Sequence, residues 1–222
     1  MRDLAGFMGW LGRAGMMPAT VIDVGVCHGT PALQDGAPDA YHILIEPLAE
    51  MEPRLAAILR RRRGEYHLTA LGARAGRAPM KVEPGAPEGA SLAGTGSIPA
   101  DDPRLREVPV QTLRRLLAGR DLARPILLKT DCQGHDLEVL KGAGRALRRR
   151  LDMVVMEANL FHPAADPRLA HLGDIVATMR RWGFDVADIL SYQPRPRDGA
   201  LGYVDLAFLR ADGPLRADHR WA

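Results

Sequence analysis

The chain has 222 residues, of which 46% are hydrophobic, and a formal net charge of +3. This length and apolar content suit a single core, so we expect one domain over residues 1–222. Aromatic residues make up 5% of the chain and none interleave with the arginine runs at 60–63 and 148–150, which argues against nucleic-acid binding.

The first 19 residues lack the layout of a secretory leader, and no apolar run approaches the roughly 20 residues that cross a bilayer. We therefore expect a cytoplasmic protein that does not bind a membrane. Its two cysteines, Cys27 and Cys132, do not make a disulfide framework outside a secretory context, and reduced thiols are expected. These features are compatible with a homo-oligomer.

The first half of the chain alternates between helical and strand patterns. Leu4, Phe7, Met8 and Leu11 have helical spacing and predict a short helix within residues 2–14, part of a helical cap over residues 1–19. Strands are expected near 20–24 and 41–46, with room for a short helix at 31–35 between them. The spacing of apolar residues predicts a longer helix over 48–63, which Gly64 ends.

A third strand is expected at 67–71 and a short additional strand at 79–82. From residue 83 to residue 103 the composition shifts to Gly, Pro, Ala, Ser and Asp without an apolar period, which predicts a long loop. Long loops inside compact domains are usually functional or disordered, so this segment is a possible flexible lid over an acceptor site.

The second half repeats the alternation. We expect strands at 108–110, 126–131, 153–157, 184–189 and 203–209, with helices over 111–117, 135–149 and 169–182. Strands that alternate with helices predict an α/β fold with a mostly parallel, Rossmann-like sheet and helices on both faces. The last two strands flank a polar turn at 194–199 and suggest a hairpin, which would make one edge strand antiparallel.

Several polar and glycine residues fall at the expected carboxyl ends of these strands, where open parallel sheets bind ligands. Gly25 and Gly29 in the turn after the first strand allow close backbone approach. Glu46, after the second strand, is placed to accept hydrogen bonds from both hydroxyls of a ribose. These features predict a site for an adenosine-containing cofactor.

Five segments together resemble the FkbM-type S-adenosylmethionine-dependent methyltransferases. They are Asp23–Gly29, Glu46-Pro47, Ala70–Gly72, Ser91-Leu92 and, most specifically, Leu127–Ala143 with its Lys-x-Asp-x-x-Gly pattern. The resemblance covers roughly residues 21–157. It implies the class I methyltransferase fold, with strand order 3-2-1-4-5-7-6 and strand seven antiparallel.

The resemblance also implies S-adenosyl-L-methionine as the cofactor and a small-molecule or glycan acceptor. The expected activity is O-methylation of a hydroxyl on a sugar, glycan or secondary metabolite. Asp131 and His135 are the candidate catalytic residues. The candidate cofactor-binding residues are Asp23, Gly25, His28, Gly29, Glu46, Leu71, Gly72 and Asp131.

Simpler roles compete with several of these assignments. Asp131 is as well placed to cap the helix beginning near His135 as to act as a base. The ammonium of Lys129, in a buried strand, needs a carboxylate partner, and Asp23 or Glu157 is the obvious choice.

Two possible metal-ligand sets are less well supported, and we predict no metal. Asp131, Glu157 and His162 offer ligands that suit Mg²⁺ but form no recognised motif. Cys27, His28, Cys132 and His135 lack the usual zinc spacing.

Two other functions remain open. One is a nicotinamide-dependent oxidoreductase, although the turn is Gly-x-x-x-Gly rather than Gly-x-Gly-x-x-Gly. The other is a noncatalytic nucleotide-binding module, in which the bulky Cys27 and His28 obstruct the amino-acid end of the cofactor.

Overall fold

The computed structural model describes residues 2–92, 95, 98–161, 170–218 and 220. The helices are α1 (Leu4–Arg13), α2 (Pro31–Gly36), α3 (Glu52–Leu59), α4 (Leu113–Leu116), α5 (Asp136–Arg148) and α6 (Leu172–Arg181), with 3-10 turns η1 (Ala49–Met51) and η4 (Pro214–Arg216). The strands are β1 (Thr20–Val24), β2 (Tyr41–Ile45), β3 (Gly64–His67), β4 (Ala70–Leu71), β5 (Gly76–Glu83), β6 (Ala86–Ser91), β7 (Leu105–Gln111), β8 (Ile126–Thr130), β9 (Met153–Asn159), β10 (Phe184–Pro194) and β11 (Leu201–Arg210).

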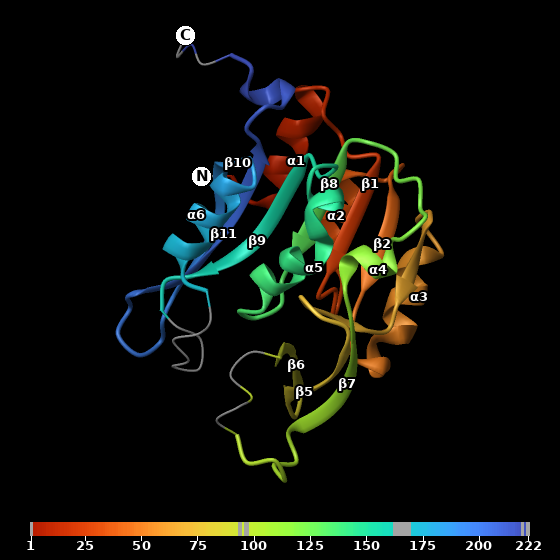
Figure 1. The fold of residues 1–222 in the computed structure, drawn as a ribbon, viewed down its shortest axis with the longest axis vertical. Helices are drawn as coiled ribbons and strands as arrows, with labels where there is room; N and C mark the ends of the chain where they lie inside the picture. The colour runs from red at the N-terminus through yellow and green to blue at the C-terminus, as the bar shows by residue number, and fades with distance from the viewer. Residues whose placement is uncertain (1, 93–94, 96–97, 162–169, 219, 221–222) are drawn as a thin grey trace.

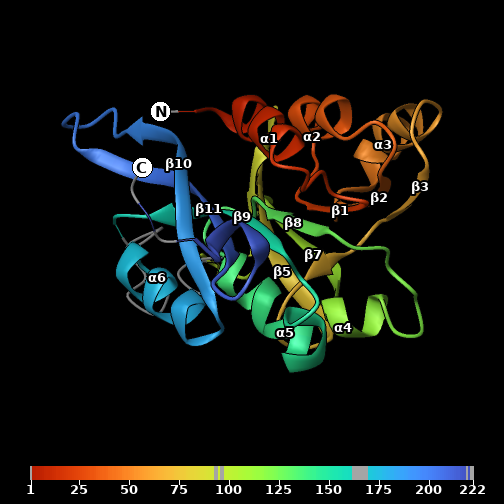
Figure 2. The ribbon, with the colours of Figure 1, turned by 90° about the horizontal axis from the view of Figure 1, so that it is seen from above.

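Seven of these strands form the main sheet, in the order β10-β11-β9-β8-β1-β2-β3. The strands from β9 to β3 are parallel to one another, and β11 runs antiparallel to both of its neighbours. Helices cover both faces, with α1, α2 and α3 on one side and α4, α5 and α6 on the other (Figures 1 and 2). The mostly parallel α/β sheet and the strand order implied by the resemblance are therefore both present.

Alternating side chains of the central strand β1 pack into two separate hydrophobic clusters. Ile22 of β1 packs in the cluster that contains Leu140 of α5. Its neighbour Val21 packs in the cluster that contains Phe7 and Leu11 of α1. Because successive side chains of a strand point to opposite faces, β1 is buried on both sides and its carboxyl end is held rigidly.

The antiparallel strand is not at the edge of the sheet, so that part of the prediction is wrong. The antiparallel β11 lies between β9 and β10, and β10 is the edge strand. The burial of the two strands gives the reason. Phe208 of β11 is fully buried, whereas Ile189 and Tyr192 of β10 are exposed, so the more apolar strand occupies the inner position.

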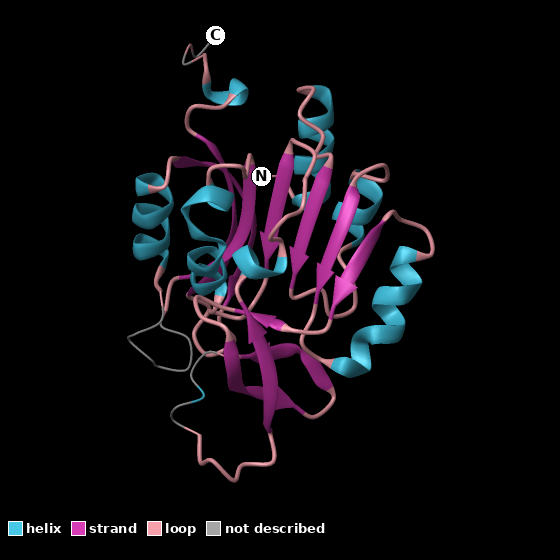
Figure 3. Ribbon diagram, turned by 45° about the vertical axis from the view of Figure 1, so that its right-hand side comes forward, coloured by secondary structure: helices cyan, strands magenta, loops and turns pink. Residues whose placement is uncertain are grey.

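A second sheet, β4-β7-β5-β6, was not predicted. It lies beyond the carboxyl ends of the parallel strands (Figure 3). The expected third strand at 67–71 is divided between the two sheets, because β3 ends at His67 and pairs with β2 while β4 pairs with β7. The segment from Ala86 to Ser91, expected as loop, is strand β6 and forms a hairpin with β5. The expected helix over 48–63 is shorter, with α3 ending at Leu59.

Candidate active site

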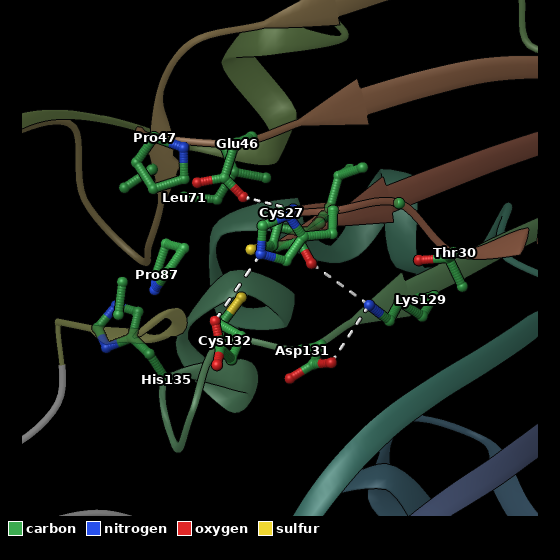
Figure 4. A pocket seen from close by; sticks show the side chains of 18 of the residues that line it. Cys27, Thr30, Glu46, Pro47, Leu71, Pro87, Lys129, Asp131, Cys132 and His135 are labelled. Atoms are coloured by element: carbon green, nitrogen blue, oxygen red, sulfur yellow. Dashed lines mark hydrogen bonds and ion pairs between the residues drawn. The ribbon is translucent and has the colours of Figure 1, made fainter. Parts of the chain in front are cut away.

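A cavity of about 400 Å³ opens at the carboxyl ends of β1, β2 and β8, within the size range of small-molecule and cofactor sites. The hairpin β5–β6 contributes Met80, Pro87, Glu88, Ala90 and the adjoining Leu92 to its wall. Predicted site residues that line the cavity are Gly25, His28, Gly29, Glu46, Leu71, Asp131 and His135. Several of them surround one space in Figure 4.

Gly25 forms the floor of the cavity, where the turn after β1 meets the end of β8. Its φ is +75°, and a Cβ there would lie 2.0 Å from the carbonyl oxygen of Asp131. Glycine is therefore required at this position, because any side chain would overlap the neighbouring backbone. The group that approaches Gly25 closely is the Asp131 carbonyl of the protein's own backbone, whereas the sequence predicted the close approach of a ligand.

Glu46 is buried at the end of β2 and fixes the same turn. One carboxylate oxygen accepts a hydrogen bond from the backbone N–H of Cys27 at 2.8 Å (Figure 4). The other accepts from Leu48 N–H at 3.0 Å. Burial raises the pKa of Glu46, and these two N–H groups oppose that rise. Since each oxygen has a second lone pair, the carboxylate keeps capacity to accept hydrogen bonds from a ligand.

The rest of the turn brings His28 and Gly29 to the cavity. Gly29 has a φ of +108°, and its N–H donates to the carbonyl of Val26 at 2.7 Å. The carbonyl of His28 accepts a hydrogen bond from Arg54 Nε of α3 at 2.7 Å. The backbone of the turn is thus held while the His28 side chain remains exposed.

Lys129 of β8 is buried between two carboxylates. Its ammonium lies 3.5 Å from Asp23 Oδ1 and 3.4 Å from Asp131 Oδ2, and it donates to the carbonyl of Gly25 at 3.4 Å. Burial acts to lower the pKa of Lys129, but Asp23 and Asp131 outweigh it and raise the pKa. Asp23 is therefore the expected partner of Lys129, rather than Glu157.

Asp23 lies beneath the cavity and is not part of its lining. The residue is 1% exposed, and neither carboxylate oxygen accepts a hydrogen bond within the described part of the chain. An isolated buried carboxylate is costly, so the Lys129 ammonium is its compensating charge. This placement suits a support for the floor.

Asp131 and His135 both face the cavity from the end of β8 and the turn before α5. The Asp131 carboxylate accepts a hydrogen bond from Gln133 Nε2 at 3.0 Å. The N-cap residue of α5 is His135, which makes no side-chain capping hydrogen bond. The carboxylate of Asp136, the first residue of the helix, accepts from the N–H groups of Cys132 and Gly134 in the preceding turn at 3.2 and 3.3 Å. Burial lowers the pKa of His135, which favours the neutral imidazole that a general base requires.

Leu71 ends β4 and Gly72 follows it, and the two residues have different surroundings. Leu71 lines the cavity, whereas Gly72 lines a neighbouring groove with His135. A Cβ on Gly142 of α5 would lie 2.1 Å from the carbonyl oxygen of Gly72. The glycine of α5 therefore allows the helix to pack tightly against Gly72.

Two acidic residues near the site were not singled out from the sequence. Glu88 lines the cavity from β6, and Asp205 reaches it from β11. The Pro84-Gly85 pair was the available signal for the hairpin that carries Glu88, since it is a common turn sequence. Asp205 is opposite Glu157 in the strand register, a relation that requires knowledge of the strand order.

Glu157 is buried at the end of β9 and accepts a hydrogen bond from Asn159 Nδ2 at 3.0 Å. Burial, followed by the charges of Asp136 and Asp131, raises the pKa of Glu157 to about 8. It does not line the cavity described above. The Mg²⁺ set considered from the sequence includes His162, which lies outside the described residues.

A family model described as the methyltransferase FkbM domain matches residues 23–186. This chain belongs to the FkbM methyltransferase family. The match confirms the resemblance found in the sequence, and it spans the floor of the cavity, the hairpin and the main parallel strands. The sequence matches no curated protein.

Two solved structures share the fold of this FkbM family member at low identity, and a third matches less well. Methyltransferase FkbM from Methylobacillus flagellatus KT matches with a TM-score of 0.52 and 17% identity, over 85% of this chain and 43% of that chain. A putative O-methyltransferase from Klebsiella pneumoniae matches with a TM-score of 0.51 and 12% identity, over 93% and 80% of the two chains. Magnesium protoporphyrin IX methyltransferase from Synechocystis PCC 6803, with bound SAH, matches with a TM-score of 0.49 and 11% identity, over 93% of this chain and 81% of that chain.

The present chain spans less than half of the Methylobacillus protein. Within the described residues, no helix has the length and apolar character needed to cross a membrane.

Proposed function

We propose that this chain binds S-adenosylmethionine in the cavity and transfers its methyl group to a hydroxyl of a sugar, glycan or secondary metabolite. Membership of the FkbM methyltransferase family supports methyl transfer. The observation that carries the cofactor assignment is the Glu46 carboxylate, buried at the cavity wall and fixed by the N–H groups of Cys27 and Leu48.

The residues present fit such a cofactor. Glu46 retains lone pairs for the two ribose hydroxyls. The 25–29 turn is open to the cavity, and Leu71 supplies an apolar wall for the adenosyl group. When bound, S-adenosylmethionine supplies a methyl group on a sulfonium that is open to nucleophilic attack.

Asp131 is the proposed group that orients the acceptor hydroxyl and takes its proton. It stands at the cavity with its side chain 45% exposed, so an acceptor can reach it. The Lys129 ammonium holds one of its oxygens, and Gln133 donates to the other. These contacts fix the carboxylate in place, which lowers the cost of aligning the nucleophile. His135 is the alternative base, because burial lowers the pKa of its imidazole, which favours the neutral form, and because it lines the same cavity.

The hairpin β5–β6 is the proposed cover of the site. Ser91 at the end of β6 donates a hydrogen bond to the carbonyl of Gln133 at 2.9 Å, which links the hairpin to the turn after Asp131. Residues 93–94 and 96–97 of the segment 83–103 lie outside the described residues. If the hairpin acts as a lid, limited proteolysis should slow when cofactor and acceptor are both present. Unchanged cleavage would leave the hairpin as a static wall.

Calorimetry with S-adenosylhomocysteine and with NAD tests the cofactor assignment. We expect binding of S-adenosylhomocysteine with one equivalent per chain and no binding of NAD. Binding of NAD alone would contradict the proposal and favour the oxidoreductase. Once binding is established, a screen of sugars and hydroxylated metabolites with labelled S-adenosylmethionine identifies the acceptor.

A further inference from the structure

Three potential metal ligands of different types meet at the rim of the cavity. Cys27 and His28 belong to the turn after β1, and Glu88 belongs to β6. The thiol sulfur, a ring nitrogen and a carboxylate oxygen all lie within 4.8 Å of one another. His28 Nε2 and Glu88 Oε2 are 3.8 Å apart.

These separations are close to those of a metal site. Zinc bonds nitrogen and oxygen at about 2.0–2.2 Å and sulfur at about 2.3 Å, so ligand atoms of a tetrahedral site lie about 3.3–3.7 Å apart. Small rotations of the side chains therefore suffice to bring the three atoms onto one ion. The side chains of His28 and Glu88 are 64% and 65% exposed, so both are free to make that adjustment and the ion can enter from solvent.

The third ligand, Cys27, has a fixed backbone conformation. Cys27 has a φ of +44°, a left-handed conformation that is unfavourable for a residue with a side chain and that is often found at ligand sites. Its N–H is held by Glu46 at 2.8 Å. The backbone of Cys27 is therefore held in place, and the exposed imidazole and carboxylate can move toward its side chain.

The local charge also suits a cation. Three carboxylates, those of Glu46, Glu88 and Asp131, line the same cavity as Cys27. These acidic surroundings attract a dication, and a bound dication stabilises the thiolate form of a coordinating cysteine. On coordination the S–H bond breaks, the sulfur bonds to the metal and the proton passes to solvent.

We propose that Cys27, His28 and Glu88 together bind one soft divalent cation, such as Zn²⁺, at the rim of the cavity. Thiolate, imidazole and carboxylate are all ligands of zinc, and three protein ligands leave a fourth tetrahedral position for water or a ligand atom. The ion links the turn after β1 to the hairpin β5–β6. This ligand set differs from the one considered from the sequence, because Glu88 replaces Cys132 and His135.

Titration of chelator-treated protein with zinc chloride, followed by calorimetry, tests the site. We expect one equivalent to bind, and Cys27→Ser and Glu88→Gln each to weaken binding at least about tenfold, since each removes one of three ligands. Cobalt(II) should give a thiolate-to-metal absorption band with the wild type that Cys27→Ser abolishes. Cys132→Ser is the matched control, because Cys132 lines the same cavity outside the cluster, and it should bind zinc like the wild type.

The proposal is overturned if no stoichiometric binding occurs, if Cys27→Ser and Glu88→Gln bind zinc unchanged, or if Cys132→Ser is the variant that loses binding. Circular dichroism verifies that each variant is folded. Binding of S-adenosylhomocysteine to the metal-free protein is measured separately. A protein that binds zinc through these residues but does not bind S-adenosylhomocysteine would contradict the proposed function and support the metal site. A protein that binds S-adenosylhomocysteine but not zinc would contradict the metal site and support the proposed function.

Discussion

The floor and the cover of the cavity are built in different ways. The floor joins the ends of β1 and β8 through backbone packing at Gly25 and through the buried Lys129 ammonium. The cover is the hairpin β5–β6, whose ion pair Lys81–Glu83 has side chains 34% and 38% exposed. Alterations to the floor should therefore disturb the fold, whereas alterations to the cover should leave stability nearly unchanged.

The largest difference is expected for the buried charge of the floor. Lys129→Met removes the partner of Asp23 and should lower the free energy of unfolding by about 3–5 kcal/mol, because a buried carboxylate is left uncompensated. Urea denaturation at neutral pH measures this change. The double variant Asp23→Asn with Lys129→Met should recover part of the loss, and Lys81→Met on the cover should change stability little. Equal effects of Lys129→Met and Lys81→Met would contradict the claim that the floor contributes more to stability than the cover.

A matched pair of glycines gives the next largest effect. Gly25 and Gly85 have φ values of +75° and +76°, but a Cβ at Gly25 overlaps the Asp131 carbonyl whereas a Cβ at Gly85 has no atom within 4 Å. Both alanine substitutions incur the left-handed cost of about 1–2 kcal/mol. The free energy of unfolding of Gly25→Ala should fall by about 1–3 kcal/mol more than that of Gly85→Ala, because of overpacking. Urea denaturation measures both values. A similar loss for the two variants would show that the floor is not tightly packed.

The pH dependence of stability further tests the contrast between floor and cover, because Glu157, an acidic residue near the floor, is buried. The pKa of Glu157 rises from an ordinary 4.5 to about 8 in the folded protein. The folded state therefore holds this proton more tightly, and the resulting stability is present below pH 4.5 and is lost as the pH rises toward 8. The loss approaches about 1.4 kcal/mol per pH unit within that window.

Glu157→Gln should remove this contribution. The decrease in unfolding free energy between pH 6 and pH 8 should be smaller in the variant than in the wild type by about 2 kcal/mol. Urea denaturation at the two pH values provides the measurement. An identical decrease in both proteins would mean that Glu157 is ionised at pH 6 in the folded state.

The smallest effect on stability is expected at Asp131. Its side chain is 45% exposed and Asp23 still compensates the Lys129 ammonium, so Asp131→Asn should lower the unfolding free energy by no more than about 1 kcal/mol. S-adenosylhomocysteine binding should persist while turnover of the identified acceptor falls, since the amide accepts no proton. Full activity in Asp131→Asn would assign a purely structural role to this carboxylate.

The floor could be largely predicted from the sequence, whereas only the first strand of the cover could, since the strand expected at 79–82 lies within β5. Continuous apolar runs ending in Asp23 and Asp131 indicate buried parallel strands, and a lysine inside such a run indicates a buried ion pair. These are local signals, and the structure contains both features.

The second strand of the hairpin, β6, lacks a comparable signal. Residues 86–91 read Ala-Pro-Glu-Gly-Ala-Ser, without apolar alternation, and pairing with β5 holds them as a strand. Proline is tolerated there because β6 is an edge strand. The contact between His28 and Glu88 depends on this pairing and so could not be inferred from spacing along the chain.

The central claim is that Glu46 anchors an adenosine cofactor in this cavity, and calorimetry of S-adenosylhomocysteine binding to wild type and Glu46→Ala tests it most directly. Because Glu46 also accepts two backbone hydrogen bonds, the assay temperature must lie below the unfolding transition of the variant. The account predicts a dissociation constant at least about tenfold weaker in the variant, from the loss of charge-assisted hydrogen bonds. Equal affinity in the folded variant would contradict it.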